Sequence, residues 1–127
     1  MKVAYVDSSC LVAIRFDEPG GRDLSKRLAS FDRRYSSNLL EAEFCAALAR
    51  ERSEDEHGLL DWMTWVFPDR PLSAEISTVL RSGYVRGPDL WHLANALYLS
   101  ETPAELPFLT LDARQREVAA AVGFPTA

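Results

Sequence analysis

The chain has 127 residues, of which 47% are hydrophobic, and a formal net charge of −5. This length supports one domain with a buried core and is too short for two ordinary domains, so we expect residues 1–127 to form a single domain. The acidic balance argues against a protein that holds nucleic acid by bulk electrostatic attraction, but it is compatible with an enzyme that meets nucleic acid through bound cations. No window approaches the roughly 18 apolar residues of a membrane span, and the N-terminus lacks signal-peptide features, so we expect a cytoplasmic protein.

Short apolar stretches alternate with helix-favouring segments along the whole chain. The pattern predicts strands at residues 2–7, 34–37, 71–73, 107–111 and 124–126. It predicts helices at residues 8–15, 22–30, 39–52, 55–66, 74–82, 89–99 and 113–122. This alternation indicates an α/β fold, in which a mostly parallel sheet lies between two layers of helices. Ligands of such sheets bind beyond the carboxyl ends of the strands.

Two aspartates come directly after predicted buried strands. Asp7 follows the run VAYV, Asp112 follows the run FLTL, and each precedes a predicted helix. Asp89 lies in the first turn of another predicted apolar helix, directly after the pair Gly87–Pro88, which interrupts the preceding secondary structure. Each has an ordinary alternative role, because aspartate is a preferred N-cap that accepts hydrogen bonds from backbone N–H groups. We expect Asp7 and Asp112 to share one edge of the sheet, within reach of Asp89.

Glu43 differs from the aspartates because it falls on the apolar face of a predicted helix. With about 100° per residue, that face consists of Leu39, Leu40, Ala46 and Ala47. A buried carboxylate must be protonated, paired with an arginine such as Arg50, or bound to a cation, since an unpaired buried charge is very costly. Glu41 points the other way and is expected at the rim or in solvent. Together with the three aspartates, Glu43 predicts a metal site.

The cysteines and aromatic residues indicate packing. Cys10 and Cys45 lack metal-ligand spacing and lie among apolar neighbours, so we expect both to be buried free thiols. The stretch LLDWMTWVF at residues 59–67 is expected to pack in the core, with an interaction surface as the alternative. His57 lies in the charged turn RSEDEHG and is expected in solvent.

Four blocks carry the acidic residues in order along the chain: VDSS, SSNLLEAEFCAALAR, PDLWHLANAL and FLTLDARQREVAAAVGF. The set spans nearly the whole chain and resembles the PIN-domain ribonucleases, particularly the VapC-like toxins of bacterial and archaeal toxin–antitoxin pairs. The resemblance implies a PIN-like three-layer α/β/α sandwich with an acidic quartet of Asp7, Glu43, Asp89 and Asp112. It also implies accompanying hydroxyls at Ser8 and Thr110, and it makes His92 a structural residue. The segment AALAR after Glu43, like the helical face, favours this residue over Glu41.

The chemistry that the resemblance implies is hydrolysis of RNA phosphodiester bonds by a Mg²⁺- or Mn²⁺-dependent endoribonuclease. Asp7, Glu43 and Asp89 would be the main ligands, and Asp112 would complete a second site or position the attacking water. Ser8 and Thr110 would orient carboxylates or waters. Single-stranded or loop RNA is the implied substrate, because its bases are accessible.

The resemblance also implies partners, namely a second copy of the chain in a homodimer and a cognate antitoxin protein whose tail covers the acidic groove. The predicted helices at 22–30 and 55–66 are the candidate surfaces. The alternative from a different class is a catalytically inactive PIN-like scaffold that binds RNA or protein. An intact quartet argues against a scaffold, because a non-catalytic fold gains nothing from clustered repulsion between carboxylates.

Overall fold

The computed structural model describes residues 1–126 and contains one four-stranded sheet in which every strand runs parallel to its neighbours. The strands are β1 (Val3–Val6), β2 (Arg33–Ser37), β3 (Met63–Val66) and β4 (Phe108–Leu109), in the spatial order β3-β2-β1-β4. In the register, Tyr5 of β1 lies beside Tyr35 of β2 on one side and Phe108 of β4 on the other. All four strands therefore end at the same edge.

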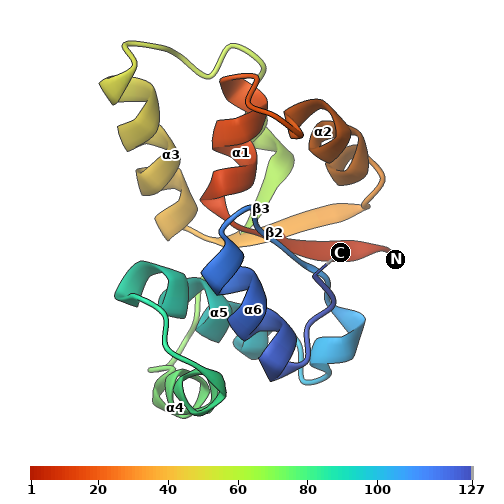
Figure 1. Ribbon diagram of the computed structural model, residues 1–127, viewed down its shortest axis with the longest axis vertical. Helices are drawn as coiled ribbons and strands as arrows, with labels where there is room; N and C mark the ends of the chain where they lie inside the picture. The colour runs from red at the N-terminus through yellow and green to blue at the C-terminus, as the bar shows by residue number, and fades with distance from the viewer. Residues whose placement is uncertain (127) are drawn as a thin grey trace.

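Six α-helices cover the two faces of the sheet (Figure 1). One layer contains α1 (Ser8–Arg15), α2 (Gly21–Ala29) and α3 (Leu39–Arg50). The other contains α4 (Ser73–Ser82), α5 (Gly87–Leu99) and α6 (Ala113–Val122). Two short 3-10 helices, η1 (Leu59–Trp62) and η2 (Pro103–Glu105), complete the elements of residues 1–126. The predicted α/β/α sandwich is confirmed, with a sheet that is entirely parallel.

The alternation of side chains along β1 explains how the sheet is buried on both faces. Ala4 and Val6 pack into a core with α1, α2 and α3, whereas Tyr5 packs into a second core with α4, α5 and α6. Successive strand residues point to opposite faces, and a parallel sheet covered by helices needs apolar residues on both. No helix within residues 1–126 has the length and apolar character needed to cross a membrane.

The helix predicted at 55–66 is wrong. The segment forms η1 and then β3, because Gly58 adopts φ +65° and the Asp55 carboxylate accepts hydrogen bonds from the backbone N–H groups of Leu59 and Leu60. The next residues, MTWV, are rich in strand formers and pair with β2 along its length. Short apolar runs carry no periodicity that separates a buried strand from a helix.

Two predicted strands are also absent from the described part of the chain. Of residues 71–73, residue 73 begins α4, and Leu72 is the buried N-cap residue of that helix. Residues 124–126 make one strand-like contact, in which the backbone N–H of Phe108 donates to the carbonyl of Pro125 at 2.8 Å. Phe124 is buried against Phe108, which explains the apolar signal at this position.

The buried face of α3 differs from the predicted one. It consists of Leu40, Phe44, Ala47 and Leu48. Ala46 is exposed, and so is Cys45, which contradicts its prediction as a buried thiol, while Cys10 is buried as predicted. The buried face is rotated because Phe44 has a larger apolar side chain than Cys45 or Ala46, and burying Phe44 turns its neighbour Cys45 outward.

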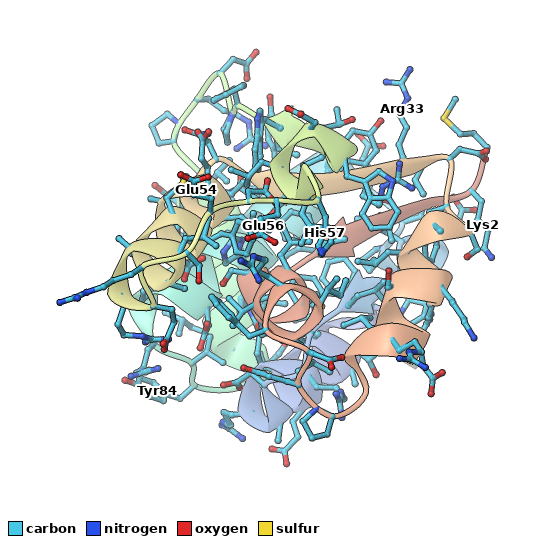
Figure 2. All side chains as sticks on the ribbon, turned by 90° about the horizontal axis from the view of Figure 1, so that it is seen from above. Lys2, Arg33, Glu54, Glu56, His57 and Tyr84 are labelled. Atoms are coloured by element: carbon cyan, nitrogen blue, oxygen red, sulfur yellow. The ribbon has the colours of Figure 1, made fainter. Side chains whose placement is uncertain are left out.

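The loop after α3 lies over α1 (Figure 2). Arg15 of α1 donates to the carbonyl of Glu54 at 2.8 Å and approaches the Glu56 carboxylate at 3.5 Å. His57 is exposed, as predicted. Leu59, Met63 and Val66 pack in the core, but Phe67 is 67% exposed, so the aromatic stretch is only partly internal.

Candidate active site

Asp7 lies where β1 ends and α1 begins, and it uses its two carboxylate oxygens differently. Its Oδ2 accepts a hydrogen bond from the backbone N–H of Ser9 at 3.0 Å, which makes Asp7 the N-cap of α1. Its Oδ1 lies 3.8 Å from Nε2 of His92. The side chain is nearly fully buried, so the ordinary capping role and a role in a site coexist in one residue.

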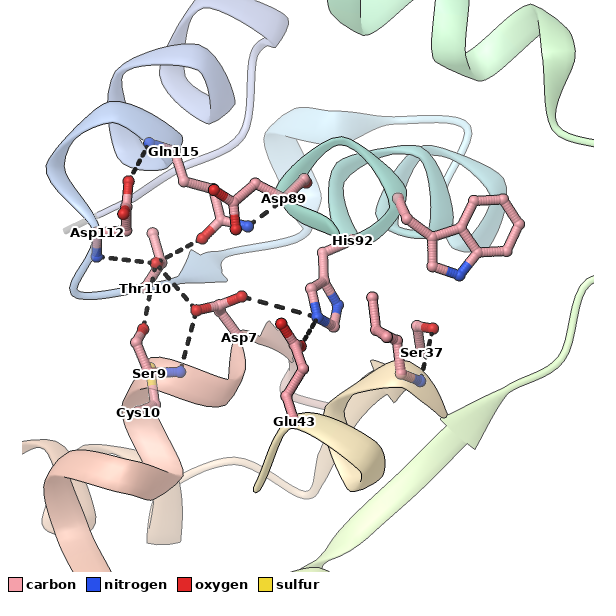
Figure 3. Close-up of polar contacts among 12 residues, drawn as sticks. Asp7, Ser9, Cys10, Ser37, Glu43, Asp89, His92, Thr110, Asp112 and Gln115 are labelled. Atoms are coloured by element: carbon pink, nitrogen blue, oxygen red, sulfur yellow. Dashed lines mark hydrogen bonds and ion pairs between the residues drawn. The ribbon is translucent and has the colours of Figure 1, made fainter. Parts of the chain in front are cut away.

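Glu43 points from α3 toward α5, where its Oε1 lies 2.7 Å from Nε2 of His92 (Figure 3). Its side chain keeps 29% exposure. The expected partners were a proton, an arginine or a cation, and the partner observed is a histidine. Arg50 lies instead 3.4 Å from Glu51.

His92 is fully buried at the centre of this arrangement. The ligand atoms of Asp7, Glu43 and His92 all lie within 4.8 Å of one another, which makes them a group able to hold a metal ion. The other ring nitrogen, Nδ1, lies 2.8 Å from Oη of Tyr5. Tyr5 was not recognised from the sequence, although a tyrosine in a buried strand signals a hydroxyl that needs a partner.

Asp89 lies in the first turn of α5 and is partly buried. Burial, and then the charges of Asp7 and Asp112, raise the pKa of Asp89 above its ordinary value, and nearby Arg86 partly opposes this. Asp89 therefore stands in the electric field of the other acids, although it lies outside the tight group of three.

Asp112 is exposed at the start of α6, where its Oδ1 accepts a hydrogen bond from the backbone N–H of Gln115 at 2.8 Å. It also stands outside the tight group. In Figure 3 its carboxylate turns toward α6, whereas Asp7 and Glu43 point toward His92. The quartet is thus brought to one edge of the sheet as an inner pair, Asp7 and Glu43, and an outer pair, Asp89 and Asp112.

A buried network of hydroxyl groups joins the start of α1 to the segment between β4 and α6 at this edge of the sheet. The hydroxyl of Thr110 donates to Oε1 of Gln115 at 2.7 Å and accepts from the backbone N–H of Asp112 at 3.1 Å. Oγ of Ser9 lies 3.3 Å from the same hydroxyl. Ser8 is half-buried in the first turn of α1, and none of the hydrogen bonds found within residues 1–126 comes from its side chain.

Gln115 and Ser9 were not singled out from the sequence. Gln115 is fully buried, and its Nε2 lies 3.5 Å from the carbonyl of Asp89, so it touches both outer acids. The local signal is weak: Gln115 stands between Arg114 and Arg116 in the sequence and one turn before the buried residues Val118 and Ala119. Arg116 adds a cation beside the network, because its Nη2 donates to the Thr110 carbonyl at 2.8 Å.

The donor set fits a hard divalent cation. Carboxylate oxygens at the inner pair suit Mg²⁺ or Mn²⁺, which prefer oxygen ligands.

The model of the PIN domain family matches residues 4–121. The chain belongs to the PIN domain family. No curated protein matches it significantly. PIN domains are in general nucleases that use divalent metals, and the acidic edge of this PIN domain has the composition for that chemistry.

Proposed function

We propose that this PIN domain is a Mg²⁺- or Mn²⁺-dependent endoribonuclease and the VapC-like toxin of a toxin–antitoxin pair. The observation that carries the proposal is the convergence of Asp7 and Glu43 at the carboxyl edge of the sheet, within 4.8 Å of each other and of His92. Two carboxylates held this close repel each other, and a divalent cation relieves that repulsion. The chain, residues 1–127, acts as one domain in this proposal.

The roles follow from where each acid lies. Asp7 and Glu43 would hold a cation, and Asp89 would complete its ligands from α5, directly or through water. Asp112, which is more exposed, would complete a second cation site or position the attacking water. Thr110 accepts a hydrogen bond from the backbone N–H of Asp112 and so fixes the backbone before it, and Ser8 would orient water beside Asp7.

A bound divalent cation would activate water for attack and neutralise charge on the scissile phosphate. The side chains of the PIN domain orient that water and keep the phosphate in line with it. Arg86 and Arg116 lie near the acidic residues. Both are suited to phosphate contacts, since a guanidinium group can donate two hydrogen bonds to two oxygens of one phosphate. The substrate is single-stranded or loop RNA, whose splayed backbone reaches an edge site without unwinding.

A cleft of about 500 Å³ supports the proposed antitoxin surface. It lies away from the acids, between α1, α2 and the segment before β3. Ile14, Leu59 and Trp62 provide apolar lining, and Asp17 and Arg22 provide charge. Both segments expected to meet partners, 22–30 and 55–66, contribute to it.

A homodimer is also proposed, and light scattering that finds only monomer at high concentration would contradict it.

The test is cleavage of a mixed RNA pool by the purified chain in Mg²⁺, Mn²⁺ or EDTA. Asp7→Asn preserves the N-cap, because asparagine also caps helices, but removes the charge. Asp23→Asn, at an exposed position of α2, is the matched control. We expect cleavage by the wild type and the Asp23 variant in Mg²⁺ or Mn²⁺, and none by Asp7→Asn or in EDTA.

The alternative, an inactive scaffold, makes a different prediction for the same experiment. A scaffold would bind RNA without cutting it, and its binding would not depend on Asp7. Full Mg²⁺-dependent cleavage by Asp7→Asn would refute the assignment of roles even if the nuclease activity were real.

A further inference from the structure

A continuous chain of hydrogen bonds runs from the backbone of β2 through two buried side chains to the Glu43 carboxylate. The backbone N–H of Ser37 donates to Oη of Tyr5 at 2.8 Å, and that oxygen lies 2.8 Å from Nδ1 of His92. On the other side of the ring, Nε2 lies 2.7 Å from Oε1 of Glu43. Tyr5 and His92 are completely buried, so their polar atoms depend on these contacts.

The direction of this chain follows from its protons. A backbone N–H can only donate, so Oη of Tyr5 accepts from Ser37, and the phenol proton remains available for donation to Nδ1 of His92. Nε2 faces a carboxylate, which can only accept, so Nε2 carries a proton and donates it to Glu43. In the tautomer protonated on Nε2, Nδ1 accepts from the Tyr5 hydroxyl.

We propose that Tyr5 locks His92 in the tautomer protonated on Nε2, and that His92 is a positioning residue that holds the Glu43 carboxylate facing Asp7 for the cation. The inference rests on the proposed function and deepens it. Of the three side chains able to hold a metal, only the two carboxylates bind it. Nε2 of His92 is not a ligand, because its proton stands where a cation would have to be.

Glu43 needs such a partner more than Asp7 does. Asp7 has a short side chain fixed by the backbone N–H of Ser9. Glu43 has a longer, partly exposed side chain, and Arg50 on its own helix is engaged with Glu51. The buried donor on α5 gives Glu43 the fixed geometry that the helix cap gives Asp7, and such supporting partners orient metal ligands.

The tautomer can be read directly from nitrogen-15 NMR of the full chain, with and without Mg²⁺. The chain has two histidines, and exposed His57 serves as the internal reference. We expect His92 to carry its proton on Nε2 and none on Nδ1 in both conditions. A proton on Nδ1, or loss of the Nε2 proton when Mg²⁺ is added, would overturn the proposal.

Mn²⁺ affinities, measured by calorimetry on variants checked for folding by circular dichroism, test the positioning role. Tyr5→Phe removes the locking proton, and we expect its Mn²⁺ dissociation constant to rise about 10-fold. Tyr35→Phe, in β2 beside the same core, is the matched control and should leave the constant unchanged. A folded Tyr5→Phe protein with the wild-type constant would overturn the proposal.

Two substitutions of His92 separate a donor from a ligand. His92→Gln can place an amide N–H near the position of Nε2–H, so it should bind Mn²⁺ more tightly than His92→Ala. Equal losses in both variants would contradict a donor role. Failure of the proposed function would look different: the wild type would bind no Mn²⁺, although the NMR spectrum would still show the proton of His92 on Nε2. That result would also overturn the proposal that His92 positions Glu43 for a cation.

Discussion

The hydroxyl of Thr110 lies 2.7 Å from Oε1 of Gln115, and this buried contact joins the residue after β4 to α6. It fixes the backbone on either side of Asp112, whose N–H donates to the same hydroxyl. Neither side chain can find water in its place, because Thr110 is 4% exposed and Gln115 is fully buried. The position of the fourth acid therefore depends on a polar pair below it.

Gln115→Leu should destabilise the protein by about 1–3 kcal/mol, because the buried Thr110 hydroxyl loses its nearest acceptor and keeps only longer contacts, with Oγ of Ser9 at 3.3 Å and Oδ2 of Asp7 at 3.5 Å. Urea unfolding measures the effect. Glu117→Gln, at an exposed position of the same helix, should change the free energy of unfolding by less than about 0.5 kcal/mol. Equal stability of the two variants would contradict the proposed importance of the pair.

Asp89 makes stability depend on pH. Its pKa is raised, first by burial and then by Asp7 and Asp112, so the folded state binds this proton more tightly than the unfolded state. Its contribution favours folding at low pH and weakens as the pH rises from the ordinary aspartate pKa, about 3.9, through the raised value. At neutral pH the ionised group therefore opposes folding in the absence of metal.

We accordingly expect Asp89→Asn to increase the free energy of unfolding at about pH 7 in EDTA and to have little effect well below the ordinary aspartate pKa. Chemical unfolding at the two pH values measures this. Added Mg²⁺ should reverse the order at neutral pH, because the cation then compensates the wild-type charge. A loss of stability in Asp89→Asn in EDTA at neutral pH would show that the sign is wrong.

Gly21 packs at the start of α2 against the backbone of α1. A Cβ at this position would lie 2.6 Å from the carbonyl oxygen of Ala13, too close for any side chain without a shift of backbone. Gly21→Ala should cost about 1–3 kcal/mol and deform the cleft that Gly21 helps to line. Gly87→Ala meets nothing within 4 Å and is the control. A thermal melt in which Gly21→Ala is as stable as Gly87→Ala would refute this packing argument.

Much of the fold and the outer frame of the site could be predicted from the sequence because they depend on local patterns. The runs VAYV and FLTL are each followed directly by an aspartate, and parallel strands bring their carboxyl ends to one edge. The segment 59–66 could not be assigned, because η1 and β3 are distinguished by a glycine conformation and by pairing with β2. Neither is a property of its apolar pattern.

The inner geometry of the site depends on contacts between distant residues, which no local pattern reports. Tyr5 and His92 are 87 positions apart, and His92 and Glu43 are 49 apart. The helical pattern indicated that Glu43 needs a partner, but the donor lies on the opposite layer of the sandwich. His92 was expected to be structural, and its burial agrees with that, while its contact with Glu43 adds a link to the candidate site.

The most direct test of the central claim compares two glutamates two positions apart on α3. Glu43→Gln keeps the shape and an oxygen that can accept from His92 but removes the charge needed to hold a cation, whereas Glu41 is exposed and points away. We predict that the rate of Mg²⁺-dependent RNA cleavage falls at least about 100-fold in Glu43→Gln and stays within about 2-fold of wild type in Glu41→Gln. Wild-type cleavage by Glu43→Gln would contradict the claim that this edge of the sheet is the nuclease site.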